Sequence, residues 1–426
     1  MTAWRMLYTA LLYLLTPLAL MRLWLRGRKQ PGYRMHISER FGRYATTAQQ
    51  PLLWLHTVSV GETLAAKPLV DALRARWPKH RILLTHMTPT GRETSERVFG
   101  DEVIRCYLPY DLPGAVGRFL AHFRPSLGVL LETEIWPNLI HACNLQGMPL
   151  YLVNARMSEQ SAHGYHRFRT FTARTLGELA GIAAQTQADA ERLTALGAAS
   201  VQVIGNLKFD RGPSPIDLEL GAQFRFAFAN RAVFLAASTR EGEEEKVLRA
   251  LEVAAHPGLL TVIVPRHPQR FEAVAQLLAA RGIAFQRRSS GAAVASTTQV
   301  WLGDSLGELF AFYAACDVAF VGGSLLPLGG QNLLEACAVG KPVLIGPSSF
   351  NFADATRWAV DVGAALQVRD EIELGRALAG LLNDPTRARR MGNAGLALMR
   401  EHRGATQRVV ELLAKSLDSV TTQSIG

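Results

Sequence analysis

Acidic side chains follow two short apolar runs, at the points where strands are expected to end. Glu62 comes after PLLWLHT in the segment VSVGET, and Glu132 and Glu134 come after SLGVLL in the segment ETEIWPN. A carboxylate at such a position can take a proton from a hydroxyl nucleophile. Each also has an ordinary alternative, because acids near a helix start offset the helix dipole, form caps or make ion pairs.

Glu132 and Glu134, two positions apart, also resemble a pair of metal ligands. A magnesium ion is commonly held by one or two carboxylates together with a substrate phosphate. The chain contains no D-x-D sequence, and this weakens the interpretation as a metal site.

Basic side chains follow other apolar runs of the same kind. Lys208 lies in NLKFD, and Arg266 and His267 lie in VPRHPQRF. A cation at the end of a strand can bind a phosphate or a carboxylate, although Lys208 is equally compatible with a solvated surface position. His267 could be a base, but a structural hydrogen bond is the more frequent role of such a histidine.

A glycine-rich segment, FVGGSLLPLGGQNLLE, follows a further apolar run. Its glycine pairs at 322–323 and 329–330 would let backbone N–H groups approach an anion, and a helix beginning near Asn332 would add positive potential. Glu335, one turn into that helix, could accept hydrogen bonds from ribose hydroxyls. The G-x-G-x-x-G and P-loop patterns are both missing, so those nucleotide-binding classes are disfavoured.

The elements that must position these side chains are short apolar runs alternating with longer helical patterns. Runs such as RILLTHM and PLYLVNA alternate with helical segments such as GAVGRFLAHF and residues 63–77. The alternation stops at DRGPSPIDLELG, where glycine and proline indicate a linker, and resumes with AVFLAAST and LLTVIVPR. This pattern predicts parallel α/β sheets, which bind ligands at the carboxyl ends of their strands.

The predicted layout is an α/β fold of the GT-B glycosyltransferase type, with two Rossmann-like domains facing a central cleft. We expect an N-terminal membrane-anchor helix with its basic flank over 1–29, a first domain over 30–210, a linker over 211–222, and a second domain with C-terminal helices over 223–426.

Residues 6–21 carry no charge, and Arg5 precedes them while Arg22, Arg26, Arg28 and Lys29 follow. Reaching the roughly 20 residues that a bilayer requires means including Arg22, whose side chain would extend to the interface. A helix lying in the membrane surface is the alternative, and a signal peptide is disfavoured because no small-x-small cleavage site follows. The basic flank places the rest of the chain on the cytoplasmic side.

The composition limits the partners. The 426 residues carry a formal net charge of +10 and 48% of them are hydrophobic, so the chain is globular and its partners are anionic. The basic residues are dispersed and no nucleic-acid-binding module is recognisable, so no nucleic-acid partner is expected. Four widely spaced cysteines without a C-x-x-C pair indicate reduced, buried thiols.

Taken in order, these segments resemble the transferases of 3-deoxy-D-manno-octulosonic acid (Kdo) in lipopolysaccharide assembly. The resemblance rests on LWLRGRK, HTVSVGET, MTPTGRE, LPYDLP, ETEIWPNLI, NARMS, LKFD, VPRHPQRF, GDSLGEL and FVGGSLLPLGGQN, and it covers both halves of the chain. It implies an inverting enzyme of the inner membrane that transfers Kdo from CMP-Kdo to the lipid A precursor lipid IVA, with no cofactor and no metal.

The resemblance also implies roles for individual residues. Glu62 corresponds to the base that deprotonates the acceptor hydroxyl, and Glu132 and Lys208 correspond to residues that stabilise the transition state. Binding of CMP-Kdo by the second domain is implied for three stretches, which are Pro265 and Arg266; Leu306, Gly307 and Glu308; and Asn332, Leu333, Leu334 and Glu335. The first domain would bind the acceptor.

Two positions depart from the family pattern GGHN-P-LE. Gln331 stands in place of a histidine and Leu333 in place of a proline. Glutamine can form hydrogen bonds but does not titrate, so no acid–base role is expected at position 331. Loss of the proline should change little, since a proline at a helix start only presets φ.

Two other functions stay open at this stage. A GT-B enzyme that uses a UDP-sugar on a lipid acceptor would share the fold, the anchor and the glycine-rich segment. A membrane-tethered protein that binds nucleotide sugars without catalysis is the second, and the set Glu62, Glu132, Lys208 and Arg266 argues against it.

Overall fold

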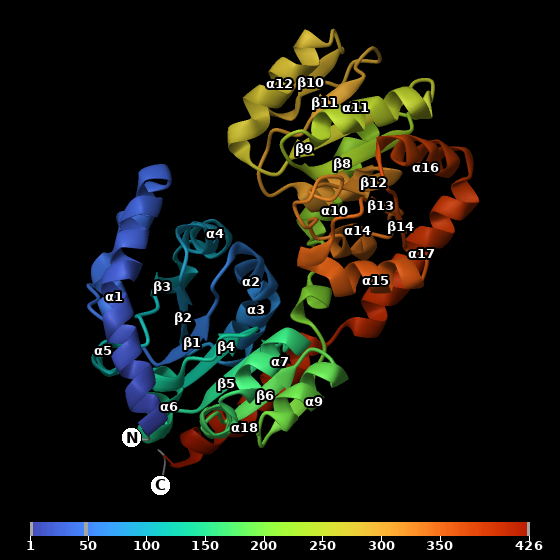
Figure 1. Cartoon of the computed structure of the whole chain (residues 1–426). Coiled ribbons are helices and arrows are strands. Elements are labelled where there is room, and N and C mark those ends of the chain that lie inside the picture. The colour runs from blue at the N-terminus through green and yellow to red at the C-terminus, as the bar shows by residue number, and fades with distance from the viewer. Residues whose placement is uncertain (1–2, 47–49, 424–426) are drawn as a thin grey trace. The chain divides into compact units, whose positions relative to one another are not determined.

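The computed structural model describes residues 3–46 and 50–423. The chain forms two compact units, and each is built around a parallel sheet (Figure 1). The first unit contains the described residues up to Asp210 together with those from Arg403 onward, and the second contains Arg211–His402.

The first unit has a seven-stranded parallel sheet of order β3-β2-β1-β4-β5-β6-β7. Its strands are β1 (Leu52–His56), β2 (Arg81–His86), β3 (Val103–Tyr107), β4 (Leu127–Leu131), β5 (Leu150–Ala155), β6 (Gly181–Ala184) and β7 (Val201–Val203). Its helices are α1 (Ala3–Lys29), α2 (Val60–Ala65), α3 (Lys67–Arg76), α4 (Pro89–Phe99), α5 (Pro113–Phe123), α6 (Pro137–Leu145), α7 (Glu159–His166), α8 (Arg169–Gly177), α9 (Gln187–Ala195) and α18 (Ala405–Gln423), with 3-10 turns η1 (Pro31–Arg34), η2 (Ile37–Phe41), η3 (Gly100–Glu102) and η4 (Leu207–Asp210).

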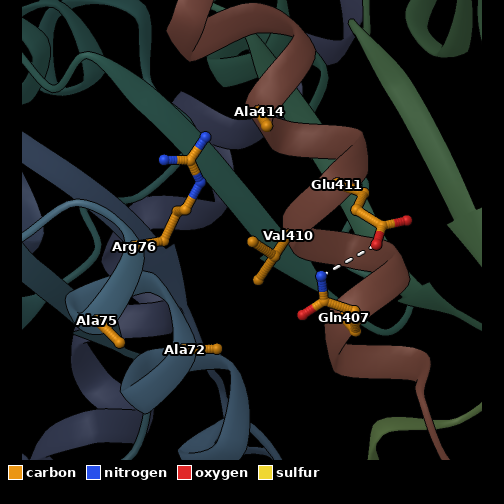
Figure 2. Close-up of a pocket in the computed structure, with 7 residues that line it drawn as sticks. All are labelled: Ala72, Ala75, Arg76, Gln407, Val410, Glu411 and Ala414. Carbon is orange, nitrogen blue, oxygen red and sulfur yellow. Dashed lines mark hydrogen bonds between the residues drawn. The ribbon is translucent and has the colours of Figure 1, made fainter.

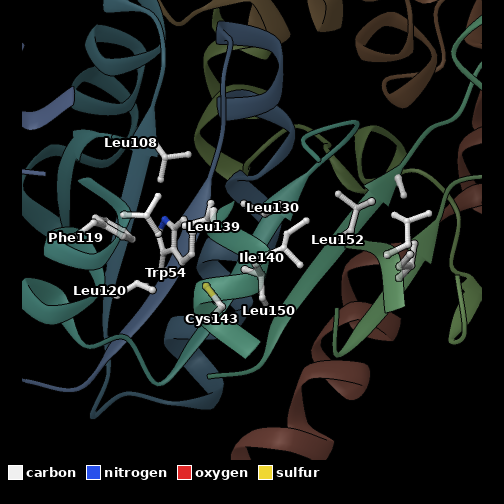
Figure 3. Close-up of a cluster of buried hydrophobic side chains, with 14 of the residues drawn as sticks. Trp54, Leu108, Phe119, Leu120, Leu130, Leu139, Ile140, Cys143, Leu150 and Leu152 are labelled. Atoms are coloured by element: carbon white, nitrogen blue, oxygen red, sulfur yellow. The ribbon is translucent and has the colours of Figure 1, made fainter. Parts of the chain in front are cut away.

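Both faces of this sheet are buried, which is why its strands read as continuous apolar runs. Alternate residues of a strand point to opposite faces, so Leu52 and Trp54 pack in one core and Leu53 and Leu55 in the other. Figure 3 shows the first of these cores, in which Trp54 packs with side chains from α5 and α6.

The second unit repeats the arrangement with a seven-stranded parallel sheet of order β10-β11-β9-β8-β12-β13-β14. Its strands are β8 (Val233–Thr239), β9 (Leu260–Pro265), β10 (Phe285–Arg287), β11 (Val300–Leu302), β12 (Val318–Val321), β13 (Val343–Ile345) and β14 (Ala365–Gln367). Its helices are α10 (Pro215–Ala227), α11 (Glu243–Ala254), α12 (Phe271–Ala280), α13 (Leu309–Ala315), α14 (Leu334–Ala338), α15 (Ala353–Asp361), α16 (Glu371–Asn383) and α17 (Pro385–His402), with η5 (Pro268–Arg270), η6 (Arg288–Ser290) and η7 (Phe350–Phe352).

The division of the chain differs from the expected boundaries in two places. Most of the expected linker, 211–222, belongs to α10, because Ser214 and Asp217 form a capping box that starts a helix there. The last helix, α18, belongs to the first unit rather than the second, because Val409 and Leu413 complete the core beneath β5 and β6. Figure 1 shows this C-terminal helix beside those strands.

The expected helix over 63–77 is interrupted. It forms two helices, α2 and α3, that meet at Ala66. Pro68 has no N–H to donate to the preceding turn, which accounts for the break.

Helix α1 is long and apolar enough to cross a membrane by its length and composition. Its first turns nevertheless dock on the first unit through polar contacts. Arg5, only 2% exposed, pairs with Glu178 at 3.1 Å, and the Tyr8 hydroxyl donates to Asp111 at 2.9 Å. The opposite side of α1 exposes large apolar side chains, namely Trp4, Met6, Leu7, Leu11, Tyr13, Leu14, Leu15, Leu18, Met21, Trp24 and Leu25.

Candidate active site

Glu62 lies in the first turn of α2, directly after β1. Ser59 caps this helix, so the turn holds Glu62 in a fixed orientation. The Glu62 carboxylate accepts a hydrogen bond from the Val58 N–H at 2.7 Å and another from the Ser59 hydroxyl at 2.8 Å. Each carboxylate oxygen therefore keeps a lone pair for a further proton.

Burial raises the pKa of Glu62 to about 7, and the negative charges of Glu132 and Glu134 add to this effect. The hydrogen bonds from Val58 and Ser59 act in the opposite direction. A carboxyl group with a pKa near neutrality can both take up and release a proton at physiological pH, which suits a general base.

Glu132 follows β4 and has a left-handed backbone, with φ of 61°. Its N–H donates to the Val153 carbonyl, which holds this residue at the edge of the sheet. Non-glycine residues rarely adopt this conformation, and such strained positions cluster at functional sites. The conformation directs the carboxylate to Lys208, whose Nζ lies 3.0 Å from Glu132 Oε1.

Lys208 lies in η4, and asparagines hold this turn in place. Asn206 Oδ1 accepts from the Lys208 N–H at 2.9 Å, and Asn154 Oδ1 accepts from the Leu207 N–H at 3.1 Å. The structure thus brings together Glu62, Glu132 and Lys208, the three candidates of the first unit, at the carboxyl edge of one sheet.

Glu134 differs from its neighbour, because its carboxylate accepts from the Trp136 indole N–H at 2.6 Å. Among the side chains that the structure describes, no group of three or more His, Cys, Asp or Glu could hold a metal ion.

The nine candidates of the second unit follow strands at the carboxyl edge of its sheet. Pro265 ends β9, and Arg266 Nε donates to Gln331 Oε1 at 3.1 Å. Leu306 and Gly307 lie in the turn after β11, where Gly307 has a φ of 85°. Glu308 ends this turn and pairs with Arg288 at 3.0 Å.

The stretch from Asn332 to Glu335 has fewer groups available to bind a ligand than its sequence indicates. Leu333 and Leu334 are buried in the core, so only their backbone groups are available. Asn332 Oδ1 accepts from the Leu334 N–H, and the largely buried Glu335 pairs with Arg211 at 2.5 Å. The helix that follows, α14, extends only from Leu334 to Ala338.

The glycine-rich segment does not present its first N–H groups to an anion, contrary to the expectation from the sequence. The buried carboxylate of Glu243 accepts from the N–H groups of Gly323, Ser324 and Leu325 at 2.5–3.0 Å. A side chain of the protein itself therefore occupies the position expected for a ligand anion. Glu243 is not among the residues selected from the sequence, although TREGEEE directly follows an apolar run.

A cavity of about 470 Å³ lies between α3 and α18, and none of the candidate residues lines it (Figure 2). Small side chains such as Ala72 and Ala414 line it together with Arg76, Gln407 and Glu411.

Two Rossmann-like units, each with a parallel sheet and candidate residues after its strands, define the GT-B fold. Solved structures share this fold. The UDP-GlcNAc 2-epimerase of Neisseria meningitidis has a TM-score of 0.56 at 19% identity and covers 86% of this chain and 100% of that one. A glycosyltransferase from Rickettsia africae has a TM-score of 0.57 at 12% identity, covering 87% and 99%.

Sequence comparison identifies the family. A family model described as 3-deoxy-D-manno-octulosonic-acid transferase (kdotransferase) matches residues 35–211. The 3-deoxy-D-manno-octulosonic acid transferase of Haemophilus influenzae is 40% identical over 424 residues, which are 97% of this chain and 99% of that protein. The one from Bordetella pertussis is 44% identical over 425 residues, 96% and 98% respectively. The chain belongs to the Kdo transferase family.

Proposed function

We propose that the enzyme transfers Kdo from CMP-Kdo to a lipid A precursor, lipid IVA, with inversion at the anomeric carbon and without a metal ion. Family membership supports the transferred sugar. The observation that carries the mechanism is the position of Glu62, a carboxyl group with a pKa of about 7 beside the Glu132–Lys208 ion pair.

Glu62 is the general base in this proposal. It takes the proton of the acceptor hydroxyl while the hydroxyl oxygen forms a bond to the anomeric carbon of Kdo. The bond from that carbon to the phosphate oxygen breaks, and CMP leaves with the electron pair. Attack from the face opposite the leaving group inverts the configuration. A base of this kind contributes about 10²–10⁴-fold to the rate.

Glu132 and Lys208 act on the charges that develop during this step. The anomeric carbon becomes positive and the departing phosphate becomes negative, so a carboxylate and an ammonium held together can offset both. Fixed charges of this kind require little reorganisation during the reaction.

The second unit binds the donor in this proposal. The Arg266 guanidinium is held by Gln331 and is suited to an oxyanion, and Glu308 and the backbone of 332–335 bind other groups of the donor in this proposal. The remaining donor-binding residues in this proposal are Pro265, Leu306 and Gly307. In this proposal the positive charge of Arg266 replaces that of a divalent ion in neutralising the leaving group.

The exposed apolar side of α1 binds the inner membrane on its cytoplasmic face. The buried Arg5–Glu178 ion pair and the Tyr8–Asp111 hydrogen bond fasten the first turns of α1 to the folded unit. These contacts favour a helix that lies in the membrane surface over one that crosses it. Arg22, Arg26 and Arg28 would then meet anionic headgroups, each adding about 1 kcal/mol.

A product assay tests the proposal. Purified protein in detergent is incubated with CMP-Kdo, generated in situ, and tetra-acylated lipid A precursor, and the product is analysed by mass spectrometry with and without EDTA. A mass gain of one or more Kdo units in both samples is expected. No gain beside an active control enzyme would refute the proposal and direct a screen of UDP-sugars.

A further inference from the structure

Four neighbouring strands of the second unit end beside one another, and three of the turns that follow them already carry candidate residues. In the order β11-β9-β8-β12, the segments after β11, β9 and β12 hold Glu308, Arg266 and Asn332. The turn after β8 lies between the last two. Its first residue is Arg240, which none of the family motifs includes.

The Arg240 side chain is next to the glycine-rich segment and to Gln331. A Cβ placed on Gly323 would lie 3.2 Å from Gln331 Nε2 and 3.6 Å from Arg240 Cγ. Gln331 in turn accepts from Arg266. The Arg240 stem and the Gln331 amide therefore both lie beside Gly323, and Arg266 binds the same amide, at the carboxyl edge of the sheet, where ligands bind in this fold.

The backbone of Arg240 is fixed by a buried acid. Glu243 Oε2 accepts from the Arg240 N–H at 2.9 Å and from the Gly323 N–H at 2.5 Å. One carboxylate thus joins the turn after β8 to the turn after β12. The Arg266 N–H donates to the Thr239 carbonyl, and this bond joins the turn after β9 to the end of β8.

Arg240 differs from the nearby Arg270 in its pairing with carboxylates. Arg270, on the following turn, pairs with Glu244 at 2.9 Å and with Glu241 at 3.6 Å. Among residues 3–46 and 50–423, no carboxylate pairs with the half-buried Arg240 guanidinium. Burial lowers the pKa of His267, and the positive charges of Arg240, Arg266 and Arg270 lower it further.

We propose that Arg240 is a second donor-binding cation, which together with Arg266 holds the two anionic groups of the donor. CMP-Kdo carries a phosphate diester and a sugar carboxylate, so two guanidinium groups match its two oxyanions. A UDP-sugar whose sugar is neutral has its negative charge on adjacent phosphates alone. The inference rests on the proposed function. It adds a residue that distinguishes a nucleotide of an acidic sugar from one of a neutral sugar.

The test compares Arg240→Gln and Arg240→Lys with the unchanged protein in two measurements. The first is the affinity for CMP, by calorimetry, and the second is the KM for CMP-Kdo in the transfer assay. We expect Arg240→Gln to weaken one or both by about 10- to 100-fold, as expected for the loss of a hydrogen bond between charged groups. Arg240→Lys, which keeps the charge, should recover part of the loss.

The two measurements identify the anion. Weaker CMP affinity places Arg240 on the phosphate, whereas unchanged CMP affinity with a raised KM for CMP-Kdo places it on the sugar carboxylate. Both values unchanged in Arg240→Gln would overturn the inference. Arg249→Gln, which removes a guanidinium that pairs with Glu371 on the surface, is the matched control and should behave as the unchanged protein.

The proposed function and the inference fail separately. If the unchanged protein transfers no Kdo, the proposed function is wrong, while CMP calorimetry still reports whether Arg240 binds the nucleotide phosphate. Thermal unfolding of both Arg240 variants shows whether they are folded. Should Arg240→Gln fail to fold, Arg240→Lys with a CMP affinity and KM equal to those of the unchanged protein would count against the inference.

Discussion

Lys208 Nζ lies 3.0 Å from Glu132 Oε1, and Glu132 reaches this position with a left-handed backbone. The ion pair joins η4 to the turn after β4. The charge of Glu132 raises the pKa of Glu62, so removing that charge should change the pH at which Glu62 titrates.

Glu132→Gln should move the acidic limb of the pH–rate profile to lower pH. Glu62 must be deprotonated to act, so activity rises with pH through its pKa of about 7. The charge of Glu132 raises that pKa, and its removal lowers it. The measurement is kcat/KM from pH 5 to pH 9. An unshifted limb would mean that the profile reports another group.

Glu62→Gln should lower kcat by about 10²–10⁴-fold, because the amide cannot accept the proton of the acceptor. CMP affinity should not change, since the donor candidates lie in the other unit. The transfer assay and CMP calorimetry measure the two effects. Glu159→Gln, at an exposed position of the same unit, is the control. Near-normal turnover in Glu62→Gln would remove this residue from the base role.

Tyr8→Phe should lower the free energy of unfolding by about 1–3 kcal/mol, because it removes a donor from the buried Asp111 carboxylate. Denaturant titration in detergent measures the change. Tyr13→Phe, on the exposed side of the same helix, should have little effect. Equal effects of the two substitutions would show that α1 does not dock through Tyr8.

Leu14→Glu should weaken binding to vesicles that contain anionic lipid by 10-fold or more. It removes a Leu side chain from the apolar side of α1, worth about 1.5–3 kcal/mol when buried, and adds a negative charge. Co-sedimentation measures the bound fraction. Leu14 is 74% exposed, and Leu145→Glu is the matched control at 73%. Similar losses for both would contradict membrane binding through α1.

Leu413→Ala should destabilise the first unit by about 2–5 kcal/mol, because Leu413 is fully buried in the core beneath the sheet. The exposed Glu411 of the same helix provides a control, Glu411→Ala. The midpoints of denaturant unfolding should separate the two variants clearly. A small effect of Leu413→Ala would place α18 outside that core.

The sequence predicted the two parallel sheets because their signal is local. Each strand is a short apolar run and each helix a longer pattern, so RILLTHM and LLTVIVPR were recognisable without knowledge of their neighbours. The attachment of α18 to the first unit was not predictable in this way. An amphipathic helix shows that it has an apolar side, but not which sheet that side will cover.

The candidate site shows the same limit. Glu62, Glu132 and Lys208 could be selected because each follows an apolar run, and the structure places them together. The roles of these residues stay predictions. The Glu243 carboxylate accepts hydrogen bonds from Gly323, Ser324 and Leu325, which lie 80 to 82 positions further along the chain. No local sequence pattern encodes such a contact.

The return of α18 to the first unit determines the order in which the protein can mature during translation. The ribosome produces residues 211–402, the whole second unit, before it produces the helix that completes the first. Until then, the face of β5 and β6 that Val409 and Leu413 cover is open to water. The N-terminal unit therefore exposes an apolar surface and is prone to aggregate while residues 211–402 are synthesised. A chaperone would be of most use to it during this period.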